Sequence, residues 1–522
     1  MKTTEIKILI FFFLLLATTS AFCQKKELQV FHAEKVLGKN FIDSSDIKGF
    51  EFAFPDRIHK TFLDTATNFL TVQLRGTSKN GKWLDNNGNI LQYDLRNHKI
   101  LWTKKMAYQK SELRQSGKTM FYRVDYKNSY LDAATGNSLW EIKNDLYFVD
   151  RINNVAIGYK YRPLKGFTNE LEGIELMNGS TIWKRELNRE YGWNNVFFVN
   201  DSTLIVVASG LHAINTNTGK GWDYDMITGE NDYTRAGIAN AIGIAAGFLT
   251  GTFFITTGHD IISGLVSNTL VDSTFIYFAS KEQLVKINKQ SGEPAWKYPL
   301  PKDLTSKSDL LMNDSTIYII NKGAADMGYR QINVGKPFIA AFDRETGKQK
   351  YFSIINVKNN PILNFQILDN EIYLVFKNKI SKYDKKTGHH IAEQIYMKEN
   401  VGELQSIVGE KAYITNQEGN LVSLIQNDST KVYVSTTQNM IISVNNQLYI
   451  TDLIELDDIS ICYLDKKDYK FIAKGGKTLI INPKGEKTAE IEVTSSAFMI
   501  EDTIYDTQYK RLKTIDLSEI IN

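Results

Sequence analysis

Cysteine and proline are scarce in this chain of 522 residues, which contains two cysteines and eight prolines. If Cys23 is removed with a leader segment, Cys462 has no second cysteine with which to form an internal disulfide. We therefore expect Cys462 to be a small buried strand residue. A net charge of only +3 gives no reason to expect nucleic acid as a partner. The few prolines, together with 26 Tyr and 28 Phe, favour a strand-rich protein.

Residue groups typical of catalysis or of metal binding are also missing. The seven histidines are scattered, and His389-His390 follows a predicted turn, where we expect the rings to face solvent. Asp452, Glu455, Asp457 and Asp458 are predicted to form a solvated acidic loop, because their spacing differs from that of an EF-hand. The sequence therefore predicts no catalytic residues, no metal, no cofactor and no small-molecule ligand.

A strand–turn–strand motif recurs along the chain. In residues 340–351, Asp343 is placed to accept hydrogen bonds from the turn amides, and Gly347 to adopt a positive φ. Tyr351 follows four residues after the glycine and begins the returning strand. The other copies, one of which lacks the glycine, contain Asp94, Trp102, Asp132, Gly136, Trp140, Gly179, Trp183, Gly219, Trp222, Gly292, Trp296, Asp384 and Gly388.

The copies recur with a period near forty residues. Gly136 and Gly179 are 43 residues apart, Gly179 and Gly219 are 40 apart, and Gly347 and Gly388 are 41 apart. A second hairpin signal, such as residues 271–277, falls once in each period. Two hairpins per repeat indicate a four-stranded antiparallel blade. We predict an all-β propeller of about eight blades, within a range of seven to ten.

The pattern Ala-x-Asp-x-x-Thr-Gly-x-x-x-Trp resembles the quinoprotein-like, or PQQ-like, propeller repeat. Asp132, Thr135, Gly136 and Trp140 match it position by position, and the resemblance is clear over residues 90–395. It implies that each aromatic residue docks against the neighbouring blade, so that the repeat residues have structural roles. The family includes quinone-dependent dehydrogenases and the BamB-like scaffold of outer-membrane protein assembly, and fold does not choose among them.

The first residues of the chain look like an export signal. A basic start is followed by a short apolar run over residues 8–16 and a small-residue site, which predicts a signal peptide over residues 1–23. Cleavage before Gln24 is favoured over lipidation of Cys23. Residues 24–49 are predicted to be a lead segment or a ring-closing strand, and residues 50–522 the propeller. We expect export to the periplasm or association with the outer membrane.

An apolar insertion rich in glycine and alanine interrupts the repeats at about residues 229–263. Residues 236–258 carry no charge and are long enough to span a bilayer, but equivalent blades on both sides argue against a crossing. One interpretation is that the insertion packs on the propeller or plugs its channel. The other is that it docks a partner or touches a membrane peripherally through Ile238, Ile242, Ile244, Phe248, Leu249, Phe253, Phe254 and Ile255.

These observations favour an exported, non-enzymatic propeller that acts as a protein-binding scaffold at the cell envelope. An unidentified envelope protein is the expected partner, and a BamB-like role in outer-membrane protein assembly is one specific version. The alternatives are a quinone-dependent dehydrogenase and a carbohydrate- or surface-binding module, the latter supported only by the many aromatic residues.

Overall fold

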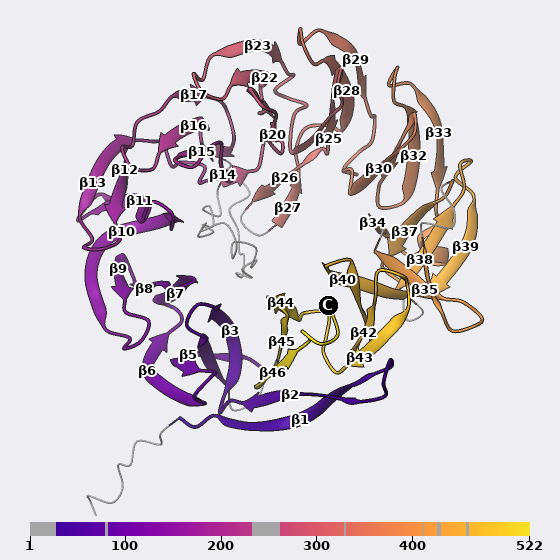
Figure 1. Cartoon of the computed structure of the whole chain (residues 1–522). Helices are drawn as coiled ribbons and strands as arrows, with labels where there is room; N and C mark the ends of the chain where they lie inside the picture. Colours follow the sequence, from indigo (N-terminus) through magenta and orange to yellow (C-terminus); the bar gives the residue numbers. More distant parts are fainter. Residues whose placement is uncertain are drawn as a thin grey trace, which may run out of the picture.

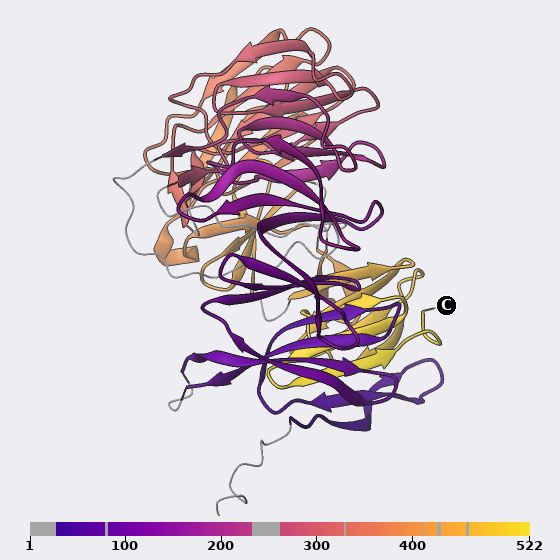
Figure 2. The same ribbon diagram turned by 90° about the vertical axis from the view of Figure 1, so that its left-hand side faces the viewer.

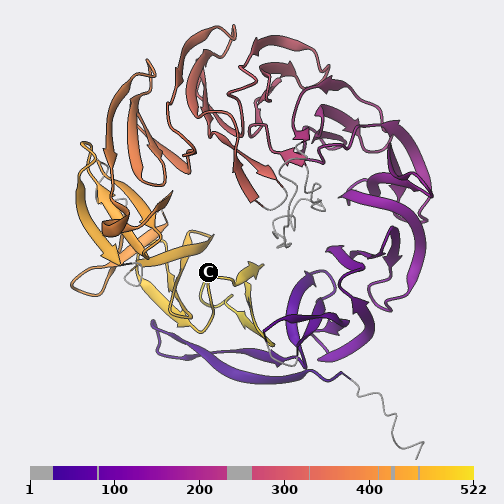
Figure 3. The ribbon, with the colours of Figure 1, turned by 180° about the vertical axis from the view of Figure 1, so that it is seen from behind.

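The strands form a ring of antiparallel sheets, seen face-on in Figure 1 and from behind in Figure 3. Within the described residues of this computed structural model the one helix is α2 (Lys398–Val401), a single turn. The prediction of an all-β propeller is confirmed. The structure describes residues 28–78, 82–231, 261–327, 330–409, 411–424, 430–455 and 459–521.

A regular blade is a four-stranded antiparallel sheet whose strands follow chain order from the inside of the ring outwards (Figure 1). Blade 7 consists of β30 (Asn364–Leu368), β31 (Glu371–Val375), β32 (Lys379–Asp384) and β33 (His390–Ile395). The two middle strands are almost entirely buried, whereas β33 alternates exposed and half-buried residues. The middle strand β31 is accordingly an almost continuous apolar run, whereas the outer strand β33 alternates.

Seven other blades repeat this pattern. Blade 1 has β3 (Arg57–Asp64), β4 (Phe69–Thr77), β5 (Leu84–Asp94) and β6 (Lys99–Ala107). Blade 2 has β7 (Ser111–Ser116), β8 (Thr119–Val124), β9 (Lys127–Leu131) and the first part of β10 (Ser138–Asp150). Blade 3 has the rest of β10, β11 (Val155–Arg162), β12 (Gly166–Glu175) and β13 (Thr181–Glu186). Because β10 continues from one blade into the next, blades 2 and 3 form one seven-stranded sheet.

The series continues with blades 4, 5, 6 and 8. Blade 4 has β14 (Asn195–Phe198), β15 (Thr203–Val207), β16 (Gly210–Asn215) and β17 (Asp223–Asp225). Blade 5 has β20 (Leu270–Val271), β21 (Phe275–Ala279), β22 (Gln283–Asn288) and β23 (Pro294–Pro299). Blade 6 has β24 (Ser308–Met312), β25 (Thr316–Asn321), β28 (Phe338–Asp343) and β29 (Gln349–Ile354). Blade 8 has β34 (Leu404–Ile407), β37 (Val432–Thr436), β38 (Met440–Val444) and β39 (Ile450–Glu455).

The two ends of the chain meet in an 11-stranded sheet that closes the ring. From the N-terminal side come β1 (Phe31–Asn40) and β2 (Asp46–Ala53); β2 pairs with β46, and β1 pairs with both β2 and β43. The boundary expected at residue 50 therefore falls inside β2. The other strands are β35 (Ala412–Thr415), β36 (Leu421–Ser423), β40 (Ile459–Lys466), β41 (Tyr469–Lys474), β42 (Lys477–Ile481), β43 (Lys487–Ile491), β44 (Phe498–Ile500), β45 (Thr503–Gln508) and β46 (Arg511–Asp516).

The expected number of eight blades is not confirmed. Beyond blade 8, β40–β43 form one blade-like group, and β44–β46 with β2 form another. Both belong to the same continuous sheet, since β1 bridges them. The described residues thus contain eight blades in succession and a closing sheet with two blade-like groups.

The hydrophobic core lies between neighbouring blades. One cluster joins Tyr318 and Ile320 of blade 6 to Ile372 and Leu374 of blade 7, and other clusters bridge other neighbours in the same way. Each blade therefore buries its faces against the next, as the repeat predicts.

Two insertions that are far apart in sequence pair with each other. The first contributes β18 (Glu230–Asn231) and β19 (Ile261–Ser263), and the second, inside blade 6, contributes β26 (Ala324–Met327) and β27 (Arg330–Asn333). These strands form a four-stranded sheet in the order β18-β19-β26-β27, which lies at the inner side of the ring (Figure 1). We call it the insertion sheet.

Candidate functional site

The repeated turns are held by the hydrogen bonds that the sequence predicts. Asp343 Oδ1 accepts hydrogen bonds from the Thr346 amide at 2.9 Å, the Thr346 hydroxyl at 2.8 Å and the Glu345 amide at 3.2 Å. These bonds, above all the one from the Thr346 amide, lower the pKa of Asp343. Gly347 has a φ of 70°, as expected. Asp132 and Asp384 bind Thr135 and Thr387 in the same way.

Each aromatic residue of the motif contacts the glycine turn of the next blade. Trp296 of blade 5 lies so close to Gly347 that a Cβ there would be 2.6 Å from its ring. Its Nε1 donates a hydrogen bond to the Arg344 carbonyl at 3.1 Å. The same pair of contacts joins Trp102 to Gly136, Trp140 to Gly179, Trp183 to Gly219, Trp222 to Gly292 and Tyr351 to Gly388.

The copy without a glycine has His98 in the glycine position. His98 has a φ of 51°, and its ring stacks on His32 of β1 with centroids 4.1 Å apart. Phe50 of β2 also contacts it, at 5.3 Å. The closing strands thus dock on blade 1 through the same turn that tryptophan contacts elsewhere.

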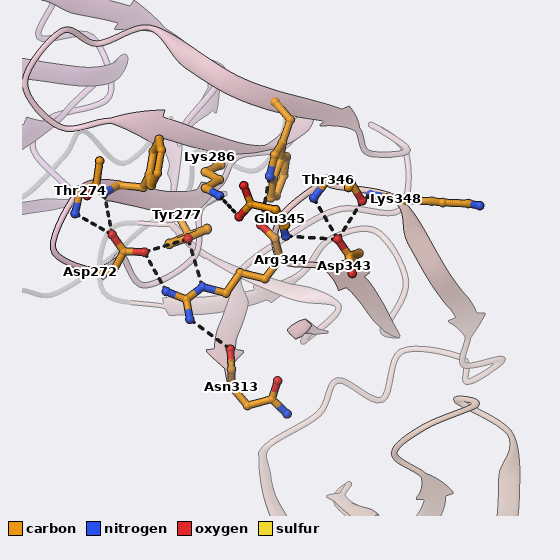
Figure 4. Close-up of polar contacts among 12 residues, drawn as sticks. Asp272, Thr274, Tyr277, Lys286, Asn313, Asp343, Arg344, Glu345, Thr346 and Lys348 are labelled. Atoms are coloured by element: carbon orange, nitrogen blue, oxygen red, sulfur yellow. Dashed lines mark hydrogen bonds and ion pairs between the residues drawn. The ribbon is translucent and has the colours of Figure 1, made fainter. Parts of the chain in front are cut away.

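A polar network reinforces the junction of blades 5 and 6 (Figure 4). Arg344 donates to Asp272 Oδ2 at 2.8 Å and to the Tyr277 hydroxyl at 3.1 Å, and Lys286 binds Glu345 at 2.8 Å. Burial alone would raise the pKa of Asp272, but the amides of Phe275 and Thr274, with Arg344 and Tyr277, hold it well below its ordinary value.

The repeat residues singled out in the sequence are therefore spread around the ring and join blades. Asp94 caps its own turn through the Asn97 amide at 2.9 Å, in line with the other copies. The structure does not gather these residues into one site. The apolar residues proposed for docking, Ile238 to Ile255, lie outside the described residues.

One face of the ring differs from this regular pattern, and we call it the insertion face. Because the strands of a blade alternate in direction, the connections between blades emerge on the same face as the loops between second and third strands. The insertion sheet belongs to this face, which Figure 2 shows edge-on. Its base is anchored: Ile262 and Leu265 are buried with Ala325, and Lys307 binds Asp326 at 2.8 Å.

An arginine enclosed by aromatic rings lies on the insertion face between blades 3 and 4. Arg189 is 5.0 Å from the ring centroids of Tyr159 and Phe167 and donates to the Tyr147 hydroxyl at 3.1 Å. It also lies 3.4 Å from Asp145. Burial raises the pKa of Tyr147 to about 12. Sequence reasoning missed this cluster, since its residues are not close in the chain and belong to no motif.

The other candidate groups have ordinary surroundings. His390 lies 3.8 Å from Glu393, and in the described part of the chain no three His, Cys, Asp or Glu side chains are grouped so that they could hold a metal ion. The prediction of an acidic loop is wrong for Asp452 and Glu455, which lie in β39, where Asp452 binds Lys431 at 3.1 Å; Asp457 and Asp458 lie outside the described residues. Cys462 is buried in β40, as predicted, and burial raises the pKa of its thiol.

Part of the chain matches a known family model. Residues 256–471 match the family model described as outer membrane protein assembly factor BamB. The resemblance to PQQ-like, BamB-like repeats is confirmed. The match begins in the first insertion and ends in β41, so it lies further along the chain than the 90–395 segment in which the motif is clearest to the eye. No curated protein matches the sequence.

Several solved propellers align loosely with the chain. BamB from Moraxella catarrhalis aligns over 73% of this chain and 96% of its own, with 11% identity and a TM-score of 0.31. Apo AztD from Citrobacter koseri aligns over 71% and 94%, with 13% identity and a TM-score of 0.30. At such TM-scores the alignments carry no argument about function. In the described residues, no helix has the length and apolar character needed to cross a membrane.

Proposed function

We propose that this chain is an exported, non-enzymatic propeller that binds protein partners at the cell envelope, in the periplasm or at the outer membrane. The family match carries the proposal, because the matched model is described as a factor in outer membrane protein assembly. A BamB-like role in that assembly is the specific form that we favour.

The insertion face is the surface that we assign to the partner. The opposite face consists largely of short turns that are engaged in holding neighbouring blades, as Asp343 and Gly347 illustrate. On the insertion face, β27 is the last strand of the insertion sheet within the described residues, and Gln331 in this strand is exposed. A strand at the end of a sheet can receive an extended segment of a partner as a further strand.

Site-specific crosslinking in intact cells tests this proposal. A photoreactive amino acid in place of Gln331 should trap one or a few envelope proteins, which mass spectrometry would identify. The matched control replaces Gln290, an exposed residue in the glycine turn of blade 5. Equal crosslinking at the two positions, or none at Gln331, would contradict the assignment.

The non-enzymatic part of the proposal has its own test. Purified protein incubated with pyrroloquinoline quinone and calcium should gain no quinone absorbance and should reduce no dye with alcohols or sugars. Dye reduction that depends on the added quinone would favour a dehydrogenase instead.

A further inference from the structure

A cavity of about 500 Å³ opens between blades 1 and 2 on the insertion face. Its walls are the starts of β3 and β7, which lie side by side at the inner rim of the ring, and the connection over residues 108–110 (Figure 1). The volume is in the range of pockets that hold small ligands. No residue of this cavity belongs to the repeat motif, and no ligand was expected here from the sequence.

Two lysines of the cavity wall, Lys60 and Lys110, are exposed, whereas Glu112 and Arg123 beside them are engaged in ion pairs. In the part of the chain that the structure describes, neither Lys60 nor Lys110 makes an ion pair or a side-chain hydrogen bond. By contrast, Glu112 binds Arg114 at 2.8 Å, and Arg123 binds Asp145 at 2.9 Å. Two ammonium groups therefore remain available to an anion in the cavity.

His59 adds a neutral donor to the same wall. Desolvation lowers the pKa of His59 to about 4, and repulsion from Arg75, Lys60 and Arg57 acts in the same direction. The imidazole is therefore uncharged at neutral pH. An anion bound beside it would offset that repulsion and favour the imidazolium form, so ligand binding should raise the pKa of His59.

The apolar part of the lining consists of Met106, Tyr108 and Leu113 and is held in place, while Gln73, Gln109 and Ser111 add polar groups. Met106 and Leu113 are buried at 3% and 2% exposure, and Tyr108 forms an edge-to-face contact with His59 at 5.1 Å. The Tyr108 hydroxyl donates to the Leu74 carbonyl at 3.0 Å, and Arg75 lies 4.7 Å from the ring centroid. The cavity thus combines cations and polar groups with a small preformed apolar area at Met106, Tyr108 and Leu113.

We propose that this cavity binds a ligand with a single carboxylate and an apolar body, with Lys60 and Lys110 on the carboxylate. With His59 neutral, the lining carries Lys60, Lys110 and Arg123 against Glu112 and Asp125, a net charge of +1. A monoanion balances that charge, whereas a doubly charged phosphate would exceed it. The apolar body lies against Tyr108 and Met106. This site is independent of the partner surface at β27.

Calorimetry with a matched pair of ligands tests the proposal. N-acetyl-leucine should bind the full chain at least about tenfold more tightly than N-acetyl-leucinamide, because only the former has the charge that the lysines recognise. The double variant K60Q/K110Q should lose about tenfold in affinity for the acid. The control K118Q/K358Q removes the same charge at two exposed lysines elsewhere and should bind as the original chain does.

A second readout keeps the result separate from any effect on folding. In NMR titrations, the acid should raise the pKa of His59 and the amide should leave it unchanged. An N-acetylated tetrapeptide ending in leucine with a free carboxylate then distinguishes the source: comparable binding means that peptide ends enter, and weaker binding means that free acids do. Equal affinity for acid and amide, or an unmoved His59, would overturn the proposal, whatever the crosslinking at Gln331 shows.

Discussion

Two arcs of the ring are held together by different means. In the keyed arc, blades 1–7 over residues 57–395, an aromatic side chain from each of blades 1–6 docks on a turn of the next blade, as Trp183 does on Gly219. The aromatic residue is lost where the closing arc, blade 8 and the 11-stranded sheet, begins: in β33 of blade 7, Ala392 stands opposite Lys382, where earlier blades have tryptophan. In the closing arc, main-chain pairing between distant strands joins the units instead.

The difference shows that blade contacts of a local, repeated kind can be replaced by contacts that depend on a few long-range pairings. Removal of one contact in the keyed arc should therefore lower the free energy of unfolding by a limited amount. Removal of the closing strands should instead unfold the protein as a whole. The predictions below probe this contrast, beginning with the largest effect.

Removal of the closing strands should abolish cooperative folding. Deleting residues 28–53 takes away Leu37, Ile47 and Phe52, all buried, and uncovers an edge of β46 and of β43. Each such side chain is worth about 1.5–3 kcal/mol, and a whole protein is stable by only about 5–15 kcal/mol. Thermal unfolding followed by circular dichroism should show no sharp transition. A sharp transition at a temperature within a few degrees of that of the full chain would show that the closing strands are not required for cooperative folding.

We call each aromatic side chain that docks on the turn of the next blade a key. Replacement of a single key should destabilise the protein without unfolding it. Trp183, 7% exposed, donates a hydrogen bond of 2.6 Å to the Thr216 carbonyl and packs on Gly219. Trp183→Ala should cost about 3–5 kcal/mol in a denaturant titration. Trp83, 73% exposed, is the matched control, and Trp83→Ala should stay within about 0.5 kcal/mol. If the two variants behaved alike, the key would have no energetic role.

The glycine under a key should tolerate a methyl group less well than a glycine elsewhere. Gly347 and Gly485 have φ of 70° and 85°, so alanine costs about 1–2 kcal/mol of backbone strain at either. At Gly347 the new Cβ would also lie 2.6 Å from Trp296, whereas at Gly485 nothing lies within 4 Å. Overpacking should add about 1–3 kcal/mol to Gly347→Ala alone. If Gly347→Ala and Gly485→Ala lowered the unfolding free energy equally, the Trp296 ring would be free to move away from the added methyl group.

The smallest effect should be a change in acid stability. The pKa of Asp272 is lower in the folded chain than in the unfolded one, so its contribution is present above the unfolded pKa and is lost as pH falls through the folded one. Asp272→Asn removes the contribution of this carboxylate. The unfolding free energy of the variant should therefore fall less steeply below about pH 4 than that of the original chain. The exposed Asp303 offers the control Asp303→Asn. Curves of the same slope for all three proteins would show that the network does not couple to pH.

The keyed arc could be predicted from the sequence because its contacts repeat at a fixed spacing. Trp140 and Gly179 belong to successive copies of one motif, so their contact follows from the propeller fold. His98 shows the limit. The missing glycine was visible in the sequence, but not that His32 and Phe50 would cover the turn, since those residues lie 66 and 48 positions away in β1 and β2.

The closing arc and the candidate sites escaped prediction for a related reason. The pairings of β1 with β43 and of β19 with β26 join segments without a shared motif, and hydrophobic alternation alone does not name a strand's partner. The blade count stayed uncertain because the signature fades where these pairings begin. Lys60 and Lys110 gave no sequence signal, since an unpaired lysine is recognised only from its neighbours in space.

The pairing of β2 with β46 also bears on how the chain is made. Glu51 of β2 binds Arg511, 460 positions later, so synthesis of nearly every blade precedes this contact. Until β46 emerges, β2 has an open edge and Phe52 lacks its cover from Leu512. Any product truncated before β46 keeps both defects exposed to proteases. Proteases can therefore distinguish complete rings from incomplete ones. We expect an unfinished chain to be degraded and not to persist as a partly functional ring.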